Sequence, residues 1–202
     1  MAYQKKNVEL KKASKRRAIY QAAIENFANN GFHKTSMSDI AKSAGVADGT
    51  LYLYFKNKDD LLITVFNEMV QEKIDTIKAA IASETNPLER LYAVFKYHID
   101  LFTHNYSYVK FFVQEVRQSP EFYERYPDFH PINQYLVLLK GLLDDCVAQG
   151  YMKEMNTELA AKILYGSVDF ILSEWSLNKE KTSLDNVYKS LIDIFHEGMK
   201  KE

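Results

Sequence analysis

Cysteine is almost missing from this sequence of 202 residues, which contains only Cys146. One cysteine excludes an intrachain disulfide framework and a zinc site built from cysteines, so we expect a reducing compartment. Proline and glycine are also scarce, with four and seven residues respectively. These counts are too low for a β protein with many tight turns.

Long apolar runs are missing as well. No stretch approaches the roughly 20 apolar residues that span a bilayer. The first residues, MAYQKKNVELKKASKRR, are charged and lack the apolar segment of a signal peptide. We therefore expect a cytoplasmic protein with no membrane partner.

The residue patterns of catalytic and metal sites are not found. His98, His104 and His130 lack close spacing with one another or with carboxylates, so we interpret them as structural histidines rather than metal ligands. The sequence has no glycine-rich phosphate loop and no recognisable pair of nucleophile and base. An enzyme is therefore not expected, and no cofactor is expected.

Charge is distributed unevenly along the chain, although the net charge is only −1. Residues 1–60 contain 11 Lys or Arg against 6 Asp or Glu, and the remainder contains 15 against 21. This asymmetry indicates a basic binding end on an acidic body. For residues 1–15 taken alone, a solvated tail explains the charge equally well.

Apolar residues recur at helical spacing along almost the whole chain, and no alternation typical of strands is long enough to count. We therefore predict an all-α fold. The helices are expected at about residues 14–30, 36–44, 50–55, 59–83, 88–104, 107–118, 132–147, 157–178 and 183–199, with an irregular connection over 119–131.

Residues 35–58 have the pattern of a helix-turn-helix. Ala41 is small where two helices must approach closely, and Gly45 lies in the turn, where a positive φ is expected. Apolar residues are placed to pin the second helix to the first: Ile40, Val46, Leu51 and Phe55. A second helix held in this way can enter the major groove of DNA and present its first residues to the base edges.

The polar residues around this pattern suit contacts with DNA. Asp48, Thr50 and Tyr52 are left pointing outward from the second helix. Ser36 begins the first helix, where a hydroxyl and backbone N–H groups can hold a phosphate. The phenols of Tyr52 and Tyr54 and the ammonium of Lys58 can also reach phosphates.

The stretch TSMSDIAKSAGVADGTLYLYFKNKDDLL resembles the N-terminal domain of TetR-family bacterial transcriptional regulators. The resemblance runs from Ile19 to about Phe66, a quarter of the chain. It implies a DNA-binding domain of three N-terminal helices, which we place over residues 1–58. It also implies a larger helical domain for effector binding and dimerisation over residues 59–202, with a homodimer formed by the last two helices. The motif residues are Phe27, Gly31, Thr35, Ile40, Ala41, Ala44, Gly45, Val46, Gly49, Thr50, Leu51, Tyr52, Phe55 and Lys58.

By position, the resemblance implies base contacts from Asp48, Gly49 and Thr50. It implies phosphate contacts from Ser36, Ser38, Tyr52, Tyr54 and Lys58. Asp48 departs from the neutral residue or lysine that is frequent at its position. A carboxylate is repelled by phosphates, so Asp48 is expected either to cap the helix or to accept a hydrogen bond from a cytosine amino group.

The C-terminal half is rich in aromatic residues, which can line an apolar cavity or simply fill the core. Carboxylates within apolar helices, such as Glu115 and Asp169, are costly to bury unless they pair with each other, face solvent or meet a ligand. The candidate effector-binding residues are Tyr97, Phe102, Phe111, Phe112, Glu115, Tyr135, Leu139, Tyr165, Asp169 and Trp175.

Two segments, 114–119 and 166–175, resemble the acyl-CoA-responsive fatty-acid-degradation repressors of bacilli, as does the recognition segment. The resemblance implies a ligand-responsive repressor whose effector is a hydrophobic small molecule such as a long-chain acyl-CoA. An alternative is a repressor of an efflux gene that responds to drugs or aromatic compounds through aromatic stacking and a carboxylate.

The last two helices suit dimerisation. One apolar stripe comprises Leu184, Val187, Leu191, Ile194 and Phe195, and a second comprises Ile163, Gly166, Ser167 and Phe170. A two-fold dimer presents two recognition helices, so its operator in double-stranded DNA should be pseudo-palindromic.

Overall fold

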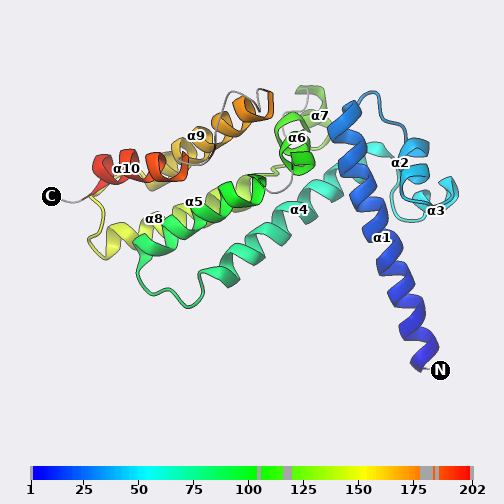
Figure 1. Cartoon of the computed structure of the whole chain (residues 1–202), viewed down its shortest axis with the longest axis horizontal. Coiled ribbons are helices and arrows are strands. Elements are labelled where there is room, and N and C mark those ends of the chain that lie inside the picture. The colour runs from blue at the N-terminus through cyan, green and yellow to red at the C-terminus, as the bar shows by residue number, and fades with distance from the viewer. Residues whose placement is uncertain (1, 104–105, 116–119, 178–183, 185–186, 201–202) are drawn as a thin grey trace. The chain divides into compact units, whose positions relative to one another are not determined.

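A computed structural model describes residues 2–103, 106–115, 120–177, 184 and 187–200 (Figure 1). No strand occurs in these ranges, and the all-α prediction is confirmed. The helices are α1 (Ala2–Asn30), α2 (Met37–Ser43), α3 (Asp48–Tyr52), α4 (Lys58–Ala80), α5 (Pro87–Thr103), α6 (Tyr106–Glu115), α7 (Pro120–Arg125), α8 (Asn133–Ala148), α9 (Thr157–Leu177) and α10 (Val187–Met199).

The chain divides into two compact units. Unit 1 comprises residues 1–68 and 110–129, and unit 2 comprises residues 69–109 and 130–202. Helices α4 and α6 each begin in one unit and end in the other. The predicted functional boundary after residue 58 therefore differs from the division by contacts, and it stays a prediction.

Unit 1 has an aromatic core. The ring of Phe111 on α6 lies 4.8 Å from that of Phe66 on α4 and 6.0 Å from that of Phe27 on α1, measured between centroids. Phe66 also contacts Phe112 and Phe129. Since these rings come from distant parts of the sequence, Phe111, Phe112 and Phe129 complete the core on which the N-terminal helices pack.

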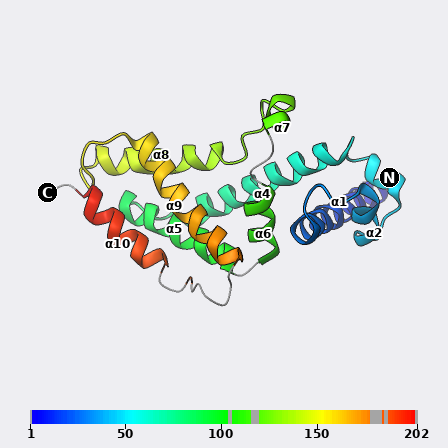
Figure 2. The same cartoon turned by 90° about the horizontal axis from the view of Figure 1, so that it is seen from above.

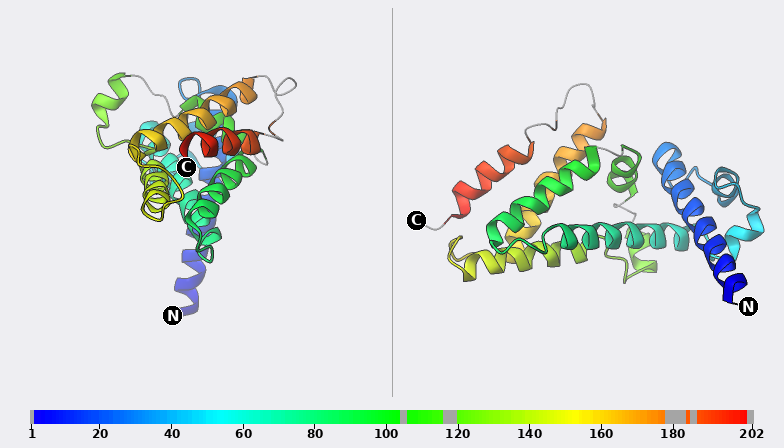
Figure 3. Two further views of the ribbon diagram at one scale, coloured as in Figure 1. Left: turned by 90° about the vertical axis from the view of Figure 1, so that its left-hand side faces the viewer. Right: turned by 60° about the horizontal axis from the view of Figure 1, so that its bottom comes forward.

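Unit 2 is a bundle of long helices. Helix α8 packs against both α5 and α9, and α10 packs against α5 (Figures 2 and 3). The apolar sides of α8 and α9 are buried against these neighbours, with Leu139, Leu143 and Leu164 almost inaccessible to solvent. None of the described helices is long and apolar enough to cross a membrane.

Helices α1 and α7 differ most from the sequence-based prediction. Helix α1 begins at Ala2 rather than near residue 14, because its first half follows the helix propensity of Lys, Glu and Ala without an apolar stripe to reveal it. Helix α7 lies within the segment predicted to be irregular, where Phe122 is buried against Phe32. Such a short helix is stabilised by its packing rather than by its sequence.

Candidate DNA-binding and effector sites

Helix α2 begins with a reciprocal capping box. The Ser36 hydroxyl accepts a hydrogen bond from the Asp39 amide (3.1 Å), and the Asp39 carboxylate accepts one from the Ser36 amide (3.0 Å). The Ser36 hydroxyl also lies 2.6 Å from the Asp39 carboxylate and can donate to it, and this hydrogen bond, followed by the one from the Ser36 amide, holds the pKa of Asp39 below its ordinary value. The cap fixes where α2 starts, and both Ser36 and Ser38 are exposed there.

The turn between α2 and α3 has the geometry that the sequence predicts. Gly45 has a φ of +66°, a conformation that side chains with a Cβ disfavour. The Val46 amide then donates to the Ala41 carbonyl at 3.0 Å. The residues that pin the two helices together are buried, namely Ile40, Ala41, Leu51 and Phe55, while Val46 is half-buried.

The outer face of α3 is open to solvent. Asp48, Gly49 and Tyr52 are exposed, and Thr50 and Tyr54 are half-buried. Leu53, which the sequence reasoning missed, is 83% exposed at the end of the helix. A leucine left so accessible beside Tyr52 is the type of apolar side chain that can contact a thymine methyl group. The sequence could have indicated Leu53, because it is an apolar residue on an otherwise polar face of the helix.

Asp48 does not cap α3, and the capping interpretation was wrong. The N-cap is Ala47, and no side chain there bonds to the helix. The error has a simple cause, because α3 starts two residues earlier than predicted and Asp48 is already inside its first turn. Its exposed carboxylate lies near the helix N-terminus, which favours a negative charge.

Lys58 is bound to the loop that precedes α2. Its ammonium donates to the carbonyl oxygens of Phe32 (2.7 Å) and Thr35 (2.8 Å), with a longer contact to His33 (3.4 Å), and lies 4.4 Å from the centre of the Phe32 ring. The phosphate contact predicted for Lys58 stays a prediction. In this structure the N–H donors of the Lys58 ammonium, which a phosphate would need, point to the loop carbonyl oxygens.

Glu115 holds the same loop from another helix. Its side chain is buried, and one carboxylate oxygen accepts a 3.0 Å hydrogen bond from the Phe32 amide. Thr35 secures the loop from within, since its buried hydroxyl bonds to the Gly31 and Asn26 carbonyls. Residues 31–36, here called the α1–α2 loop, are therefore tied to α1, α4 and α6 together.

The predicted effector residues fall into two groups. Phe111, Phe112 and Glu115 lie in unit 1 and contribute to its core, while the others lie in unit 2. The side chain of Phe102 lies outside the described residues. Within unit 2, Tyr135, Leu139 and Asp169 are buried. Tyr97, Tyr165 and Trp175 are half-buried.

A buried polar cluster lies among the aromatic residues of unit 2. A ring nitrogen of His98 and the Tyr135 hydroxyl are 2.9 Å apart, and the ring of Tyr165 packs edge-on against Tyr135. Burial lowers the pKa of His98 to about 4 and raises the pKa of Tyr135 above its ordinary value. Both groups are therefore uncharged at neutral pH. Among the described residues, no histidine belongs to a group that could hold a metal.

A second aromatic contact joins the start of α6 to α9. The Tyr106 hydroxyl donates to the Ser176 carbonyl (2.9 Å), and its ring meets Trp175 edge to face. The effector residues chosen from the sequence include Trp175 but not Tyr106, since the two residues are distant in sequence and share no motif.

A small apolar cavity lies between α5, α9 and α10. Its volume is about 10 Å³, which is close to the space of one water molecule. Among the residues that line it are Tyr92, Phe95, Leu164, Leu191 and His196. The Tyr92 hydroxyl is hydrogen-bonded to a ring nitrogen of His196. No predicted effector residue lines this cavity, and a drug-sized ligand needs at least about 300 Å³.

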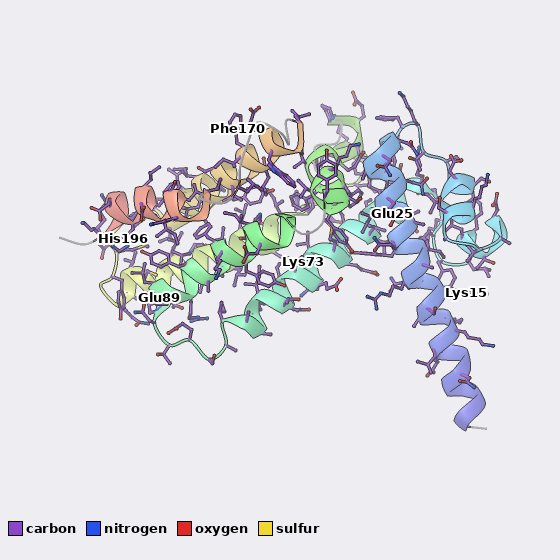
Figure 4. All side chains as sticks on the ribbon, viewed as in Figure 1. Lys15, Glu25, Lys73, Glu89, Phe170 and His196 are labelled. Carbon is purple, nitrogen blue, oxygen red and sulfur yellow. The ribbon has the colours of Figure 1, made fainter. Side chains whose placement is uncertain are left out.

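Helix α9 carries an exposed apolar stripe. Leu159, Ile163, Phe170 and Leu177 fall on one line of the helix, and Phe170 is 67% exposed (Figure 4). The predicted stripe on α10 behaves differently. Leu184 and Leu191 are buried and Phe195 lines the cavity, which leaves Ile194 exposed.

Comparison with known proteins places the chain in a family. Residues 19–65 match the model for bacterial regulatory proteins of the tetR family, and residues 66–198 match that of the YsiA-like protein C-terminal region. The chain belongs to the TetR family. The members it resembles are transcription regulators rather than enzymes, as the sequence predicted.

Several relatives cover almost the whole length of this TetR-family protein. The fatty acid metabolism regulator protein of Bacillus subtilis (strain 168) is 33% identical over 183 residues, which is 90% of this chain and 93% of that protein. The structure of the fatty acid degradation regulator FadR from Bacillus halodurans has 30% identity and a TM-score of 0.84, covering 92% of this chain and all of that one.

A further structure has a ligand. The transcriptional regulator FadR from Bacillus subtilis, solved in complex with stearoyl-CoA, has 33% identity and a TM-score of 0.83, and covers 91% of this chain and 98% of that one. The sequence-based resemblance to the fatty-acid-degradation regulators of bacilli is therefore confirmed.

Proposed function

We propose that this TetR-family regulator is a repressor that binds a pseudo-palindromic operator as a dimer and releases it when a long-chain acyl-CoA binds. The observation that carries the proposal is the α2–α3 geometry, in which a capped first helix and a buried seam leave one face of α3 uncovered. A cytoplasmic location, where such a regulator meets the chromosome, is part of the proposal.

The DNA-binding part rests on the exposed side chains of α3 and α2. We propose that Gly49, Thr50 and Tyr52 contact base edges and the backbone, and that Asp48 accepts a hydrogen bond from a cytosine amino group. The exposure of Asp48, Gly49 and Tyr52 supports this assignment. Ser36, Ser38 and Tyr54 are the proposed phosphate contacts at the sides of the groove. We add Leu53 to this set because it is the most exposed large apolar side chain of the helix-turn-helix.

The effector part rests on likeness to the regulator solved with stearoyl-CoA. The cavity between α5, α9 and α10 is far too small for an acyl chain. We propose that acyl-CoA binding separates side chains that are packed together in this structure. The aromatic residues of unit 2, together with Asp169, remain the proposed lining of the opened site.

The dimer part rests on the α9 stripe. Four large apolar side chains on one face of a helix have no partner in the described chain, and a stripe of this kind is typical of an interface with a second copy. Gly166 interrupts the stripe and permits close helix approach. The contribution of α10 is expected to be smaller than predicted, because Leu191 is buried within the chain and Phe195 lines the cavity.

The coupling between effector and operator can use α6. Its first residue, Tyr106, is bonded to α9, and its last residue, Glu115, is bonded to the α1–α2 loop. Acyl-CoA would need a higher affinity for the state in which α6 no longer holds the loop in its DNA-binding position. A shift of this kind typically changes operator affinity 5- to 150-fold.

The test is operator binding with and without effector. A duplex selected from a random pool would be titrated with the protein by fluorescence anisotropy, alone and with stearoyl-CoA. We expect stearoyl-CoA to weaken binding at least about fivefold, whereas CoA with free stearate leaves it unchanged. Failure to select any duplex would contradict the whole proposal, and a duplex whose affinity ignores stearoyl-CoA would contradict the effector part alone.

A further inference from the structure

Helix α1 is much longer than its packing requires. It starts at Ala2, but the first buried side chain among those that the structure describes in it is that of Ile19, and the family match also begins there. Residues 9–18 are all exposed. Most of the stability of a protein helix comes from tertiary packing, and the exposed residues of this extension contribute little to it.

The exposed extension is strongly basic. Lys11, Lys12, Lys15, Arg16 and Arg17 fall within it, against a single acidic residue, Glu9. Arg16 forms an ion pair with Glu68 of α4, which ties the extension to unit 1. The three lysines have no carboxylate partner among the residues that the structure describes. They are therefore available to an anion from outside the chain.

The lysines lie on the side of α1 that faces the helix-turn-helix. That side is marked by Asn26, whose amide donates to the Ser43 hydroxyl at the end of α2 (3.0 Å). At 100° per residue, Lys15 falls within about 20° of the Asn26 line, and Lys12 and Lys11 within about 40° and 60°. Lys11, Lys12 and Lys15, here called the α1 basic stripe, therefore continue the face against which α2 packs.

The stripe also lies beyond the helix-turn-helix along the axis of α1. With a rise of 1.5 Å per residue, Lys15 is about 17 Å and Lys11 about 23 Å from Asn26. In Figures 1 and 4 this part of α1, which carries Lys15, projects past α2 and α3. A base pair advances DNA by about 3.4 Å, so the stripe reaches several base pairs from the position of α2.

We propose that the α1 basic stripe binds the phosphate backbone of DNA that flanks the operator half-site. The inference rests on the proposed DNA-binding function. Duplex DNA is the occupant because it is the polyanion that the neighbouring α2 and α3 would bring to this same face. Exposed lysines at helical spacing match a run of phosphates and carry no sequence preference. The stripe thus contributes affinity, and α3 contributes the choice of site.

The test variant is Lys11→Gln/Lys12→Gln/Lys15→Gln. Glutamine retains helix propensity while removing the charge, and circular dichroism checks that the fold is kept. Binding is measured over a range of KCl concentrations on two selected operators, one with ten flanking base pairs at each end and one trimmed to the half-sites. For three lost phosphate contacts, the slope of log affinity against log salt falls by about 2.7 per bound protomer.

The expected result is specific to the flanks. The variant loses at least about tenfold in affinity on the long duplex and little on the trimmed one, and its ratio of specific to scrambled binding changes little. Lys11→Arg/Lys12→Arg/Lys15→Arg retains the wild-type slope. The matched control is Lys78→Gln/Lys153→Gln/Lys189→Gln, which removes the same charge from exposed positions in unit 2.

Two outcomes would overturn the inference. An unchanged salt slope on the long duplex would show that the protein binds DNA without the α1 basic stripe. The stripe would then be assigned to an acidic protein surface instead. An equal loss in the matched control assigns the effect to net charge. If the wild-type protein binds no duplex at all, the proposed DNA-binding function is contradicted. This result is distinguishable from the two outcomes that concern only the stripe.

Discussion

Glu115 accepts a hydrogen bond from the backbone amide of Phe32, 83 positions earlier in the chain. The two residues join the end of α6 to the loop that positions α2. Lys58 binds the carbonyl oxygen of the same Phe32. The backbone N–H and C=O groups of Phe32 are thus bound by side chains from two different helices, α6 and α4. These two helices therefore fix the loop that leads into the helix-turn-helix.

Removing the Glu115 carboxylate should destabilise unit 1. Glu115→Ala leaves the buried Phe32 amide without its acceptor, which costs about 1–3 kcal/mol in the free energy of unfolding. Urea denaturation followed by circular dichroism measures the loss. Glu115→Gln should recover part of it through its amide oxygen, and the exposed Glu124→Ala is the control. Equal stability of Glu115→Ala and the wild type would show that the hydrogen bond is unimportant.

Lys58 has two candidate roles that salt titration separates. Lys58→Met retains the apolar stem over Phe32 but removes the donors to the Phe32 and Thr35 carbonyls. We expect weaker operator binding with an unchanged salt slope, because the loop is displaced while no phosphate contact is lost. A slope reduced by about 0.9 per protomer would instead support the phosphate contact predicted from the sequence.

The outer face of α3 should carry site selection. Thr50→Ala/Tyr52→Ala is expected to abolish specific operator binding, since loss of a good base contact alone costs about 1–3 kcal/mol. The buried seam formed by Leu51 and Phe55 is untouched, so the melting temperature and the oligomeric mass should stay as in the wild type. Retained preference for the operator over scrambled DNA would count against α3 as the recognition helix.

Burial of His98 predicts a pH-dependent stability. Its pKa is about 4 in the folded chain and about 6.5 in an unfolded one, so below pH 6.5 the unfolded state binds the additional proton. Stability is therefore fully present above pH 6.5 and falls as the pH drops toward 4, by up to about 1.4 kcal/mol per pH unit.

His98→Gln should flatten this part of the pH profile, because glutamine does not titrate and can still bond to the Tyr135 hydroxyl. Urea denaturation at pH 7.5, 6.0 and 5.0 provides the measurement. The exposed His130→Gln is the matched control and should retain the wild-type slope. A wild-type slope in His98→Gln would assign the acid sensitivity to other groups.

The α9 stripe should control the oligomeric state. Ile163→Glu/Phe170→Glu places two carboxylates on the exposed apolar face, and burying them in an interface would be strongly unfavourable. Analytical ultracentrifugation is expected to give the monomer mass for this variant and the dimer mass for Val137→Glu, which alters an exposed position on α8. A dimer that survives the double substitution would place the interface elsewhere.

Much of the DNA-binding unit could be predicted from the sequence because its determinants are local. The positive φ at Gly45, the small Ala41 and the buried Leu51 follow from residue type and spacing within one short segment. The start of α3 could not be placed as well. Ala47 caps it without a side-chain bond, so no capping residue marked the boundary.

The candidate effector site was less accessible, since aromatic residues at helical spacing do not indicate which neighbours they meet. Phe111 and Phe112 complete the core of unit 1, whereas Tyr135 joins His98 in unit 2. The apolar stripe of α10 was read correctly as a stripe, but Leu191 on it is buried within the chain. Periodicity identifies a buried face and cannot identify what covers it.

The sequence by itself determined the all-α fold, the helix-turn-helix and the family, because helix periodicity, a glycine turn and small residues at a helix contact act over a few positions. Only the tertiary structure decided what Lys58 and Glu115 bind and that the α1 lysines lie on the face of the helix-turn-helix. These relationships depend on distances between segments far apart in the chain, which are set by the packing of the core as a whole.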